Sequence, residues 1–151
     1  MKNIFTNEVL VRAAKEILKE YAEMKFLVDY VPGEKQTKLN TVLNLMESVL
    51  ERIRNTHPDG EKLYTVLFNC HFSGKKVNRT MLCEKIGMET AGRELTVSTL
   101  YRWQMEAIRI YACILWADPQ FTDESLKLFQ STELKKDYSK ICEEWKKLKN
   151  A

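Results

Sequence analysis

A short run of hydroxyl residues followed by an arginine is the part of this sequence whose residue types best suit binding. Ser98 and Thr99 stand where a helix is predicted to begin, and Arg102 follows one turn later. Serine and threonine side chains cap the free N–H groups at a helix start, and those N–H groups also bind phosphate well. An arginine one turn into a helix reaches a phosphate or the edge of a guanine. These residues favour contact with DNA, with Ser98 as the expected cap and Thr96 as its alternative.

Basic residues are concentrated around this predicted helix. Residues 73–109 carry seven Lys or Arg against four Asp or Glu, whereas the two types balance on either side, so the whole net charge of +3 lies in this segment. A local excess of positive charge is what phosphate binding requires. The expected DNA contacts are Lys75, Lys76, Arg79, Arg93, Ser98, Thr99, Arg102 and Arg109.

The predicted helix over residues 98–117 has two different halves. At about 100° per residue, one narrow polar strip collects Ser98, Arg102, Glu106 and Arg109. From Ile110 onward the helix is apolar nearly all round, which is typical of a core or an interface. A helix whose C-terminal half is buried in the core and whose N-terminal half is exposed to solvent is suited to DNA recognition. The same pattern also fits an ordinary core helix with a capped start and a solvated polar strip.

The predicted helix and the segment before it resemble a known DNA-binding arrangement. The residues that carry the resemblance are Ser98-Thr99-Leu100-Tyr101-Arg102, followed by an apolar helix with Ala107, Ala112, Leu115 and Trp116. Residues 63–117 resemble the helix-turn-helix of sigma region-four domains, and more closely the phage-associated ArpU/RinA-like transcriptional regulators. The resemblance implies sequence-specific binding of duplex DNA and control of phage or prophage genes.

The segment that joins the two helices of this arrangement is predicted to be long. Asn78 is expected to cap a short helix that ends at Gly87, and a loop is expected from Gly87 to Leu95. A standard helix-turn-helix needs only a few residues in its turn. Either the loop carries a basic insertion around Arg93, or the two helices do not form a true helix-turn-helix.

The remaining apolar residues also recur at helical spacing. They predict helices over residues 10–28, 39–53 and 63–72, a short helix capped by Thr122 or Asp123, and one helix over 134–148, with Thr6 or Asn7 capping the first. Only five glycines and three prolines are present, which favours helices. The expected fold is a compact all-α single domain, 1–151, with a helical pair (1–57), a helix-turn-helix-like core (60–118) and C-terminal helices (119–151).

The reactive residue types form no recognisable catalytic or metal-binding pattern. Each of the four cysteines lies in an apolar helical pattern, so they are expected to be buried and reduced: Cys70, Cys83, Cys113 and Cys142. The sequence has two histidines, no phosphate-binding glycine loop and no clustered carboxylates. We therefore expect neither enzymatic activity nor a metal or other cofactor.

The longest apolar run, residues 110–117, is too short to cross a bilayer, and residues 1–8 lack a signal-peptide core. A cytoplasmic protein without a membrane partner is expected. Duplex DNA is the expected partner, while RNA polymerase, another protein or a second copy of the chain are further candidates. The alternative function is a helical protein-interaction module, such as a phage-encoded inhibitor or adaptor, whose arginines would face an acidic protein instead of DNA.

Overall fold

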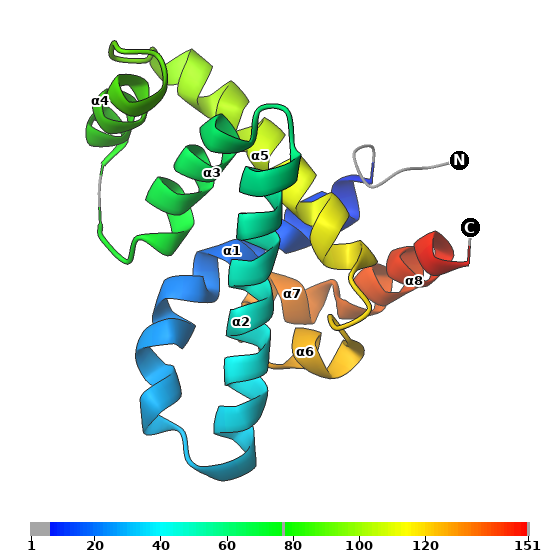
Figure 1. Ribbon diagram of the computed structural model, residues 1–151. Helices are drawn as coiled ribbons and strands as arrows, with labels where there is room; N and C mark the ends of the chain where they lie inside the picture. Colours follow the sequence, from blue (N-terminus) through cyan, green and yellow to red (C-terminus); the bar gives the residue numbers. More distant parts are fainter. Residues whose placement is uncertain (1–6, 77, 151) are drawn as a thin grey trace.

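The computed structural model describes residues 7–76 and 78–150, and this part of the chain contains helices and no strand (Figure 1). The all-α prediction is therefore confirmed. The elements are α1 (Glu8–Leu27), the 3-10 helix η2 (Val28–Tyr30), α2 (Gly33–Thr56), α3 (Gly60–Leu67), the π-helix η3 (Phe68–Phe72), α4 (Arg79–Thr90), α5 (Val97–Ala117), α6 (Asp123–Lys127), α7 (Thr132–Lys136) and α8 (Tyr138–Lys149). No helix in the described residues is both long and apolar enough to span a membrane.

Side-chain caps begin several of these helices. The side chain of Asn7 accepts the N–H of Leu10 at 3.1 Å, and that of Asn78 accepts the N–H of Met81 at 2.8 Å. Thr122 and the third residue of α6, Ser125, form a reciprocal capping box. Asn7, Asn78 and Thr122 were among the expected caps, so those predictions are confirmed; Thr6 lies outside the described residues.

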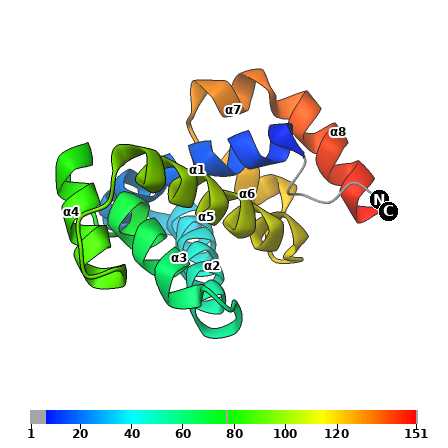
Figure 2. The ribbon, with the colours of Figure 1, turned by 90° about the horizontal axis from the view of Figure 1, so that it is seen from above.

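Helix α5 lies at the centre of the arrangement. It packs against α1, α2 and α3, and α7 and α8 contact α1. Seen from above, α5 runs between α3 and α1, with α7 and α8 on the far side of α1 (Figure 2). Helices α1 and α2 are joined through η2 at the bottom of Figure 1, away from α4 and the start of α5. One end of α5 is therefore enclosed by other helices.

The second half of α5 is tied to its neighbours by aromatic side chains. The indole N–H of Trp116 donates to the carbonyl oxygen of Leu10 at 2.8 Å. The hydroxyl of Tyr111 donates to the carbonyl oxygen of Met46 at 2.9 Å. The indole N–H of Trp145 on α8 donates to the carbonyl oxygen of Trp116 at 2.9 Å. All three aromatic side chains are buried, and their polar atoms are hydrogen-bonded, as burial requires. The prediction that this half of the helix is anchored in the core is confirmed.

Two predicted elements differ from the structure. The expected helix over 134–148 is two helices, α7 and α8, because the backbone changes direction at Asp137, whose φ and ψ are −96° and 10°. The expected helix over 63–72 is α-helical only as far as Leu67 and continues as the π-helix η3. Apolar spacing does not distinguish one continuous α-helix from two consecutive helices, or from an α-helix that continues as a π-helix. In both places the same face of the chain remains buried.

None of the four cysteines forms a disulfide bond within the described residues, and only Cys83 is buried. Cys70, Cys113 and Cys142 are partly buried, so the prediction of four buried thiols is wrong for these three. These three side chains pack against the buried core but are not fully covered, and a helical pattern in the sequence does not predict how far a neighbouring helix will cover a residue.

Candidate nucleic-acid interface

The turn between α4 and α5 lies directly on α4. The N–H of Leu95 donates to the carbonyl oxygen of Cys83 at 3.1 Å, and the N–H of Arg93 donates to that of Gly87 at 3.3 Å. A β-carbon on Gly87 would lie 2.1 Å from the carbonyl oxygen of Arg93, so only glycine allows this approach. The expectation that Gly87 ends the helix is wrong: α4 continues to Thr90, and the turn is shorter than predicted.

Helix α5 begins one residue earlier than expected because its cap is Thr96. Its hydroxyl oxygen accepts the N–H of Thr99 at 3.1 Å, and the backbone of Thr96 is extended, as a cap requires. Ser98 lies inside the first turn with its side chain exposed. The prediction of Ser98 as the cap is therefore wrong, and the alternative, Thr96, is correct.

The first two turns of α5 expose one face. Val97 is 51% exposed and Tyr101 is 62% exposed, and the side chains of Ser98 and Arg102 are also exposed. Leu100, on the opposite face, is buried and holds this part of the helix against the body of the protein. Arg102 forms no ion pair within the described residues. The exposed face thus combines a hydroxyl, a phenol and a guanidinium with one small apolar group.

The far end of the predicted polar strip is engaged with other helices. Arg109 forms an ion pair with Glu8 at the start of α1, with 3.0 Å between Nη1 and Oε1. Glu106 pairs with Lys62 on α3 at 3.7 Å, and the Lys62 ammonium lies 4.7 Å from the centre of the Trp103 ring. We therefore leave Arg109 out of the proposed interface, because its guanidinium joins α5 to α1.

The other predicted basic residues are exposed and lie around α4. Arg79 is the first residue of α4, Arg93 lies in the α4–α5 turn, and Lys75 and Lys76 lie in the segment before α4. None of these four forms an ion pair with another described residue. Lys75 and Lys76 line a pocket together with residues of α1, and they precede the start of α4, whereas α5 follows its other end. Thr99 is partly buried, and its hydroxyl accepts a hydrogen bond from Thr96.

Exposed apolar side chains at this end of the molecule were not among the residues predicted from the sequence. Met81 and Met88 on α4 are 51% and 57% exposed, and they add to the exposed Val97 and Tyr101 of α5. The signal was present in the sequence, because α4 carries apolar residues on its exposed face as well as on its buried one. Exposed apolar side chains of this size can contact bases or another protein.

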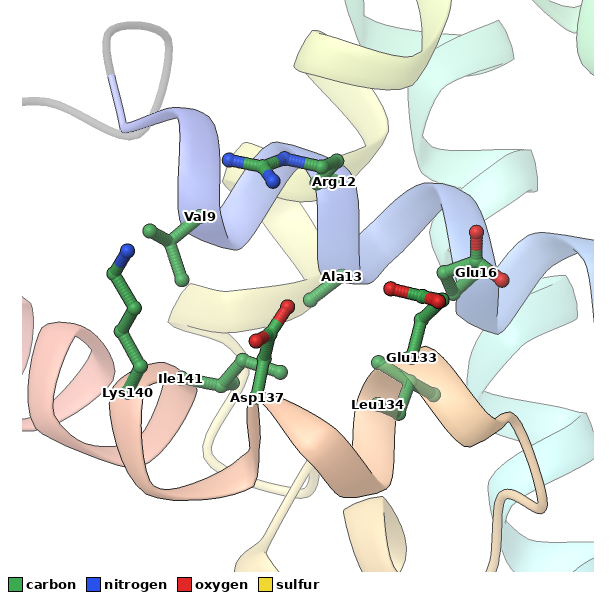
Figure 3. A pocket seen from close by; sticks show the side chains of 9 residues that line it. All are labelled: Val9, Arg12, Ala13, Glu16, Glu133, Leu134, Asp137, Lys140 and Ile141. Carbon is green, nitrogen blue, oxygen red and sulfur yellow. The ribbon is translucent and has the colours of Figure 1, made fainter.

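A second pocket lies between α1 and the α7–α8 region, away from the basic end (Figure 3). Val9, Ala13, Leu134 and Ile141 give it an apolar floor. Figure 3 shows the carboxyl groups of Glu133 and Asp137 pointing toward α1. Since Arg12 and Lys140 also line it, the pocket carries charges of both signs and selects no ligand class by charge.

The assignment of the cap predicts a difference between two neighbouring hydroxyl residues. Thr96→Ala is expected to lower the free energy of unfolding by about 1 kcal/mol, because the N–H of Thr99 loses its acceptor. Ser98→Ala is expected to change it by less than about 0.5 kcal/mol, because the side chain is exposed and outside the cap. Urea denaturation followed by circular dichroism measures both. A larger loss for Ser98→Ala than for Thr96→Ala would contradict this assignment.

No protein-family model, curated protein or solved structure matches this chain. The residues at the α4–α5 end and their surroundings are therefore the basis for the function proposed below.

Proposed function

We propose that the protein binds duplex DNA through the first two turns of α5, as a small transcriptional regulator of the phage or prophage type. The observation that carries the proposal is the division of α5 into a buried second half and a first half with exposed Ser98, Tyr101 and Arg102. A helix held firmly at one end is suited to entering the major groove with the other.

Each exposed side chain at the start of α5 has a suitable contact on DNA. The Arg102 guanidinium would donate to the two acceptors of a guanine edge or to a phosphate, and the Val97 side chain would contact a thymine methyl group. The hydroxyls of Ser98 and Tyr101 would donate to phosphate oxygens or base acceptors. These contacts need no rearrangement of α5, because its exposed face is free of ion pairs within the described residues.

Two further cations would contribute to phosphate binding. Arg93 lies in the turn immediately before α5, and Arg79 begins α4, and both are exposed. Carboxylates are also present on this side of the molecule, at Glu84, Glu89 and Glu94. Arg79, Lys85, Arg93 and Arg102 exceed these three carboxylates by one charge. So small an excess favours an interface in which a few phosphate contacts position α5 and base contacts give specificity.

Arg102→Ala tests the proposal. We expect DNA affinity to fall by about 1–3 kcal/mol, since an arginine that reads a base contributes about that much. The fold should be unchanged, because Arg102 is exposed. Fluorescence anisotropy with a labelled duplex selected from random sequences measures the affinity. Arg12→Ala is the matched control, because Arg12 is also an exposed helical arginine but lies on α1 beside α7 and α8. Equal affinity for parent and Arg102→Ala would contradict the proposed face.

The second candidate function is binding to another protein, and the exposed side chains of Met81, Met88, Val97 and Tyr101 favour it. Methionine and tyrosine are common at protein interfaces because they fill irregular surfaces with large apolar groups. Binding dominated by these side chains would respond weakly to salt, whereas DNA binding responds strongly. Salt dependence therefore separates the two functions.

A further inference from the structure

A basic pocket lies between α1 and residues 73–76, the described residues of the segment that follows η3 and precedes α4, called the connecting segment below. Its charged and polar lining comes from two separate parts of the chain, and the proposed contacts of α5 make no use of it. Helix α1 contributes Lys19 and Glu23, η3 contributes His71, and the connecting segment contributes Ser73, Lys75 and Lys76. The lining thus includes three lysines, Lys19, Lys75 and Lys76, and one acidic residue, Glu23, which gives the pocket a net positive charge.

The walls of this pocket are held by specific contacts. The N–H of Ser73 donates to the carbonyl oxygen of Phe68 at 2.8 Å and ends η3, and Gly74 then takes the left-handed conformation with φ of +73°. The Ser73 hydroxyl oxygen accepts the N–H of Lys75 at 3.3 Å. On the other side, the rings of Phe72 and Tyr21 lie 4.5 Å apart and hold η3 against α1. The pocket is therefore fixed by packing at its base.

The imidazole ring of His71 is uncharged at neutral pH and lies near positively charged lysine side chains. Burial, together with the nearby Lys15 and Lys19, lowers the pKa of the imidazole to about 4. Its ring forms no hydrogen bond with another described residue. Neutral imidazole keeps one N–H donor. Lys19 pairs with Glu16 at 3.3 Å, but both side chains reach solvent and such a pair is weak enough to exchange its partner.

We propose that this pocket binds a phosphate group, held by the ammonium groups of Lys19, Lys75 and Lys76 and by the N–H of His71. The phosphate would be either a free phosphate or phosphomonoester, or a backbone phosphate of DNA. In both cases the negative charge offsets the repulsion among the lysines, and the tetrahedral oxygens accept from several donors at once. The inference does not depend on the role assigned to α5, because a free phosphate needs only this pocket.

His71 also reports on occupancy of the pocket, because an anion near the imidazole stabilises its charged form. The groups that face it are Lys15, Lys19 and Glu23 from α1, and Lys75 and Lys76 from the connecting segment. His57, in the α2–α3 turn, is the other histidine of the chain and serves as an internal control in the same spectrum.

The test is a proton NMR titration of the two histidines in the full chain. Inorganic phosphate added at pH 7.5 and constant ionic strength is expected to move the His71 signals to saturation and leave those of His57 in place. In a pH series with sulfate, which remains doubly charged, the pKa of His71 is expected to rise by about one pH unit. The double variant Lys75→Glu/Lys76→Glu should abolish both effects, whereas Lys35→Glu/Lys38→Glu, two exposed lysines of α2, should keep them.

A duplex DNA titration distinguishes the two sources of phosphate. If DNA moves the His71 signals and inorganic phosphate does not, the pocket takes a backbone phosphate. If inorganic phosphate acts alone, the ligand is a free phosphate or phosphomonoester, and this result stands even if α5 does not bind DNA. If neither ligand moves the signals, or if Lys75→Glu/Lys76→Glu responds like the parent, the inference is overturned.

Discussion

Trp116→Ala is expected to lower the free energy of unfolding by about 3–5 kcal/mol, the range for removing a large buried aromatic side chain. Trp116 is 0% exposed, and its ring meets Phe121 and Trp145 edge-on, with centroid distances of 5.4 and 4.9 Å. The substitution opens a cavity at the junction of α5, α1 and α8. It also leaves the carbonyl oxygen of Leu10 without the indole donor, which adds a desolvation cost.

Chemical denaturation followed by circular dichroism measures this loss without relying on tryptophan fluorescence. Val97→Ala is the control within the same helix, because Val97 is exposed and its truncation should cost less than about 0.5 kcal/mol. A loss below about 1 kcal/mol for Trp116→Ala would mean that the second half of α5 does not anchor the helix, and the division of α5 would lose its physical basis.

Gly87→Ala is expected to destabilise the protein by about 1–3 kcal/mol, although alanine is intrinsically the better helix former by about 1 kcal/mol. The new β-carbon would lie 2.1 Å from the carbonyl oxygen of Arg93 and 2.8 Å from the backbone nitrogen of Leu95. Both are backbone atoms, so the α4–α5 turn must move away from α4. Because that turn leads directly into α5, DNA affinity should also fall, by about tenfold or more.

Denaturation and anisotropy measurements on the same preparation test both effects. Lys85→Ala is the control, since Lys85 is an exposed residue of α4 outside the turn contact. Stabilisation by Gly87→Ala, as at an ordinary helical glycine, would show that the close contact between the turn and α4 does not form in solution.

The sequence predicts most of the helices because the signals for them are local. Apolar spacing and the hydroxyl or amide side chains of Asn7, Asn78 and Thr122 act within one or two turns of the chain. The prediction that Gly87 ends the helix is wrong for the opposite reason, because the role of Gly87 depends on a contact that is not local. A glycine that ends a helix and one that lets another segment approach look the same in sequence, and the distinguishing contact, with Arg93, exists only in the folded chain.

The candidate site likewise depends on contacts between residues that are distant in the sequence, and local patterns do not predict these contacts. The helical wheel groups Arg109 with Arg102, but it does not include Glu8 on another helix, which engages Arg109. Thr96 and not Ser98 caps α5 because the backbone of Thr96 is the one in the extended conformation, which the residue types do not predict. The basic pocket joins Lys19 to Lys75 and Lys76 across a large sequence separation, so no local pattern indicates it.

The most direct test of the central proposal is the salt dependence of binding between the parent protein and random-sequence duplex DNA. We predict measurable binding at low salt and a slope of log affinity against log salt concentration of about −2 to −3, as expected if about two or three phosphates are neutralised by Arg79, Arg93 and Arg102. Fluorescence anisotropy over a range of about 50 to 200 mM KCl covers the region where such binding changes most. Absence of binding at the lowest salt concentration, or a slope near zero, would contradict DNA binding by the start of α5.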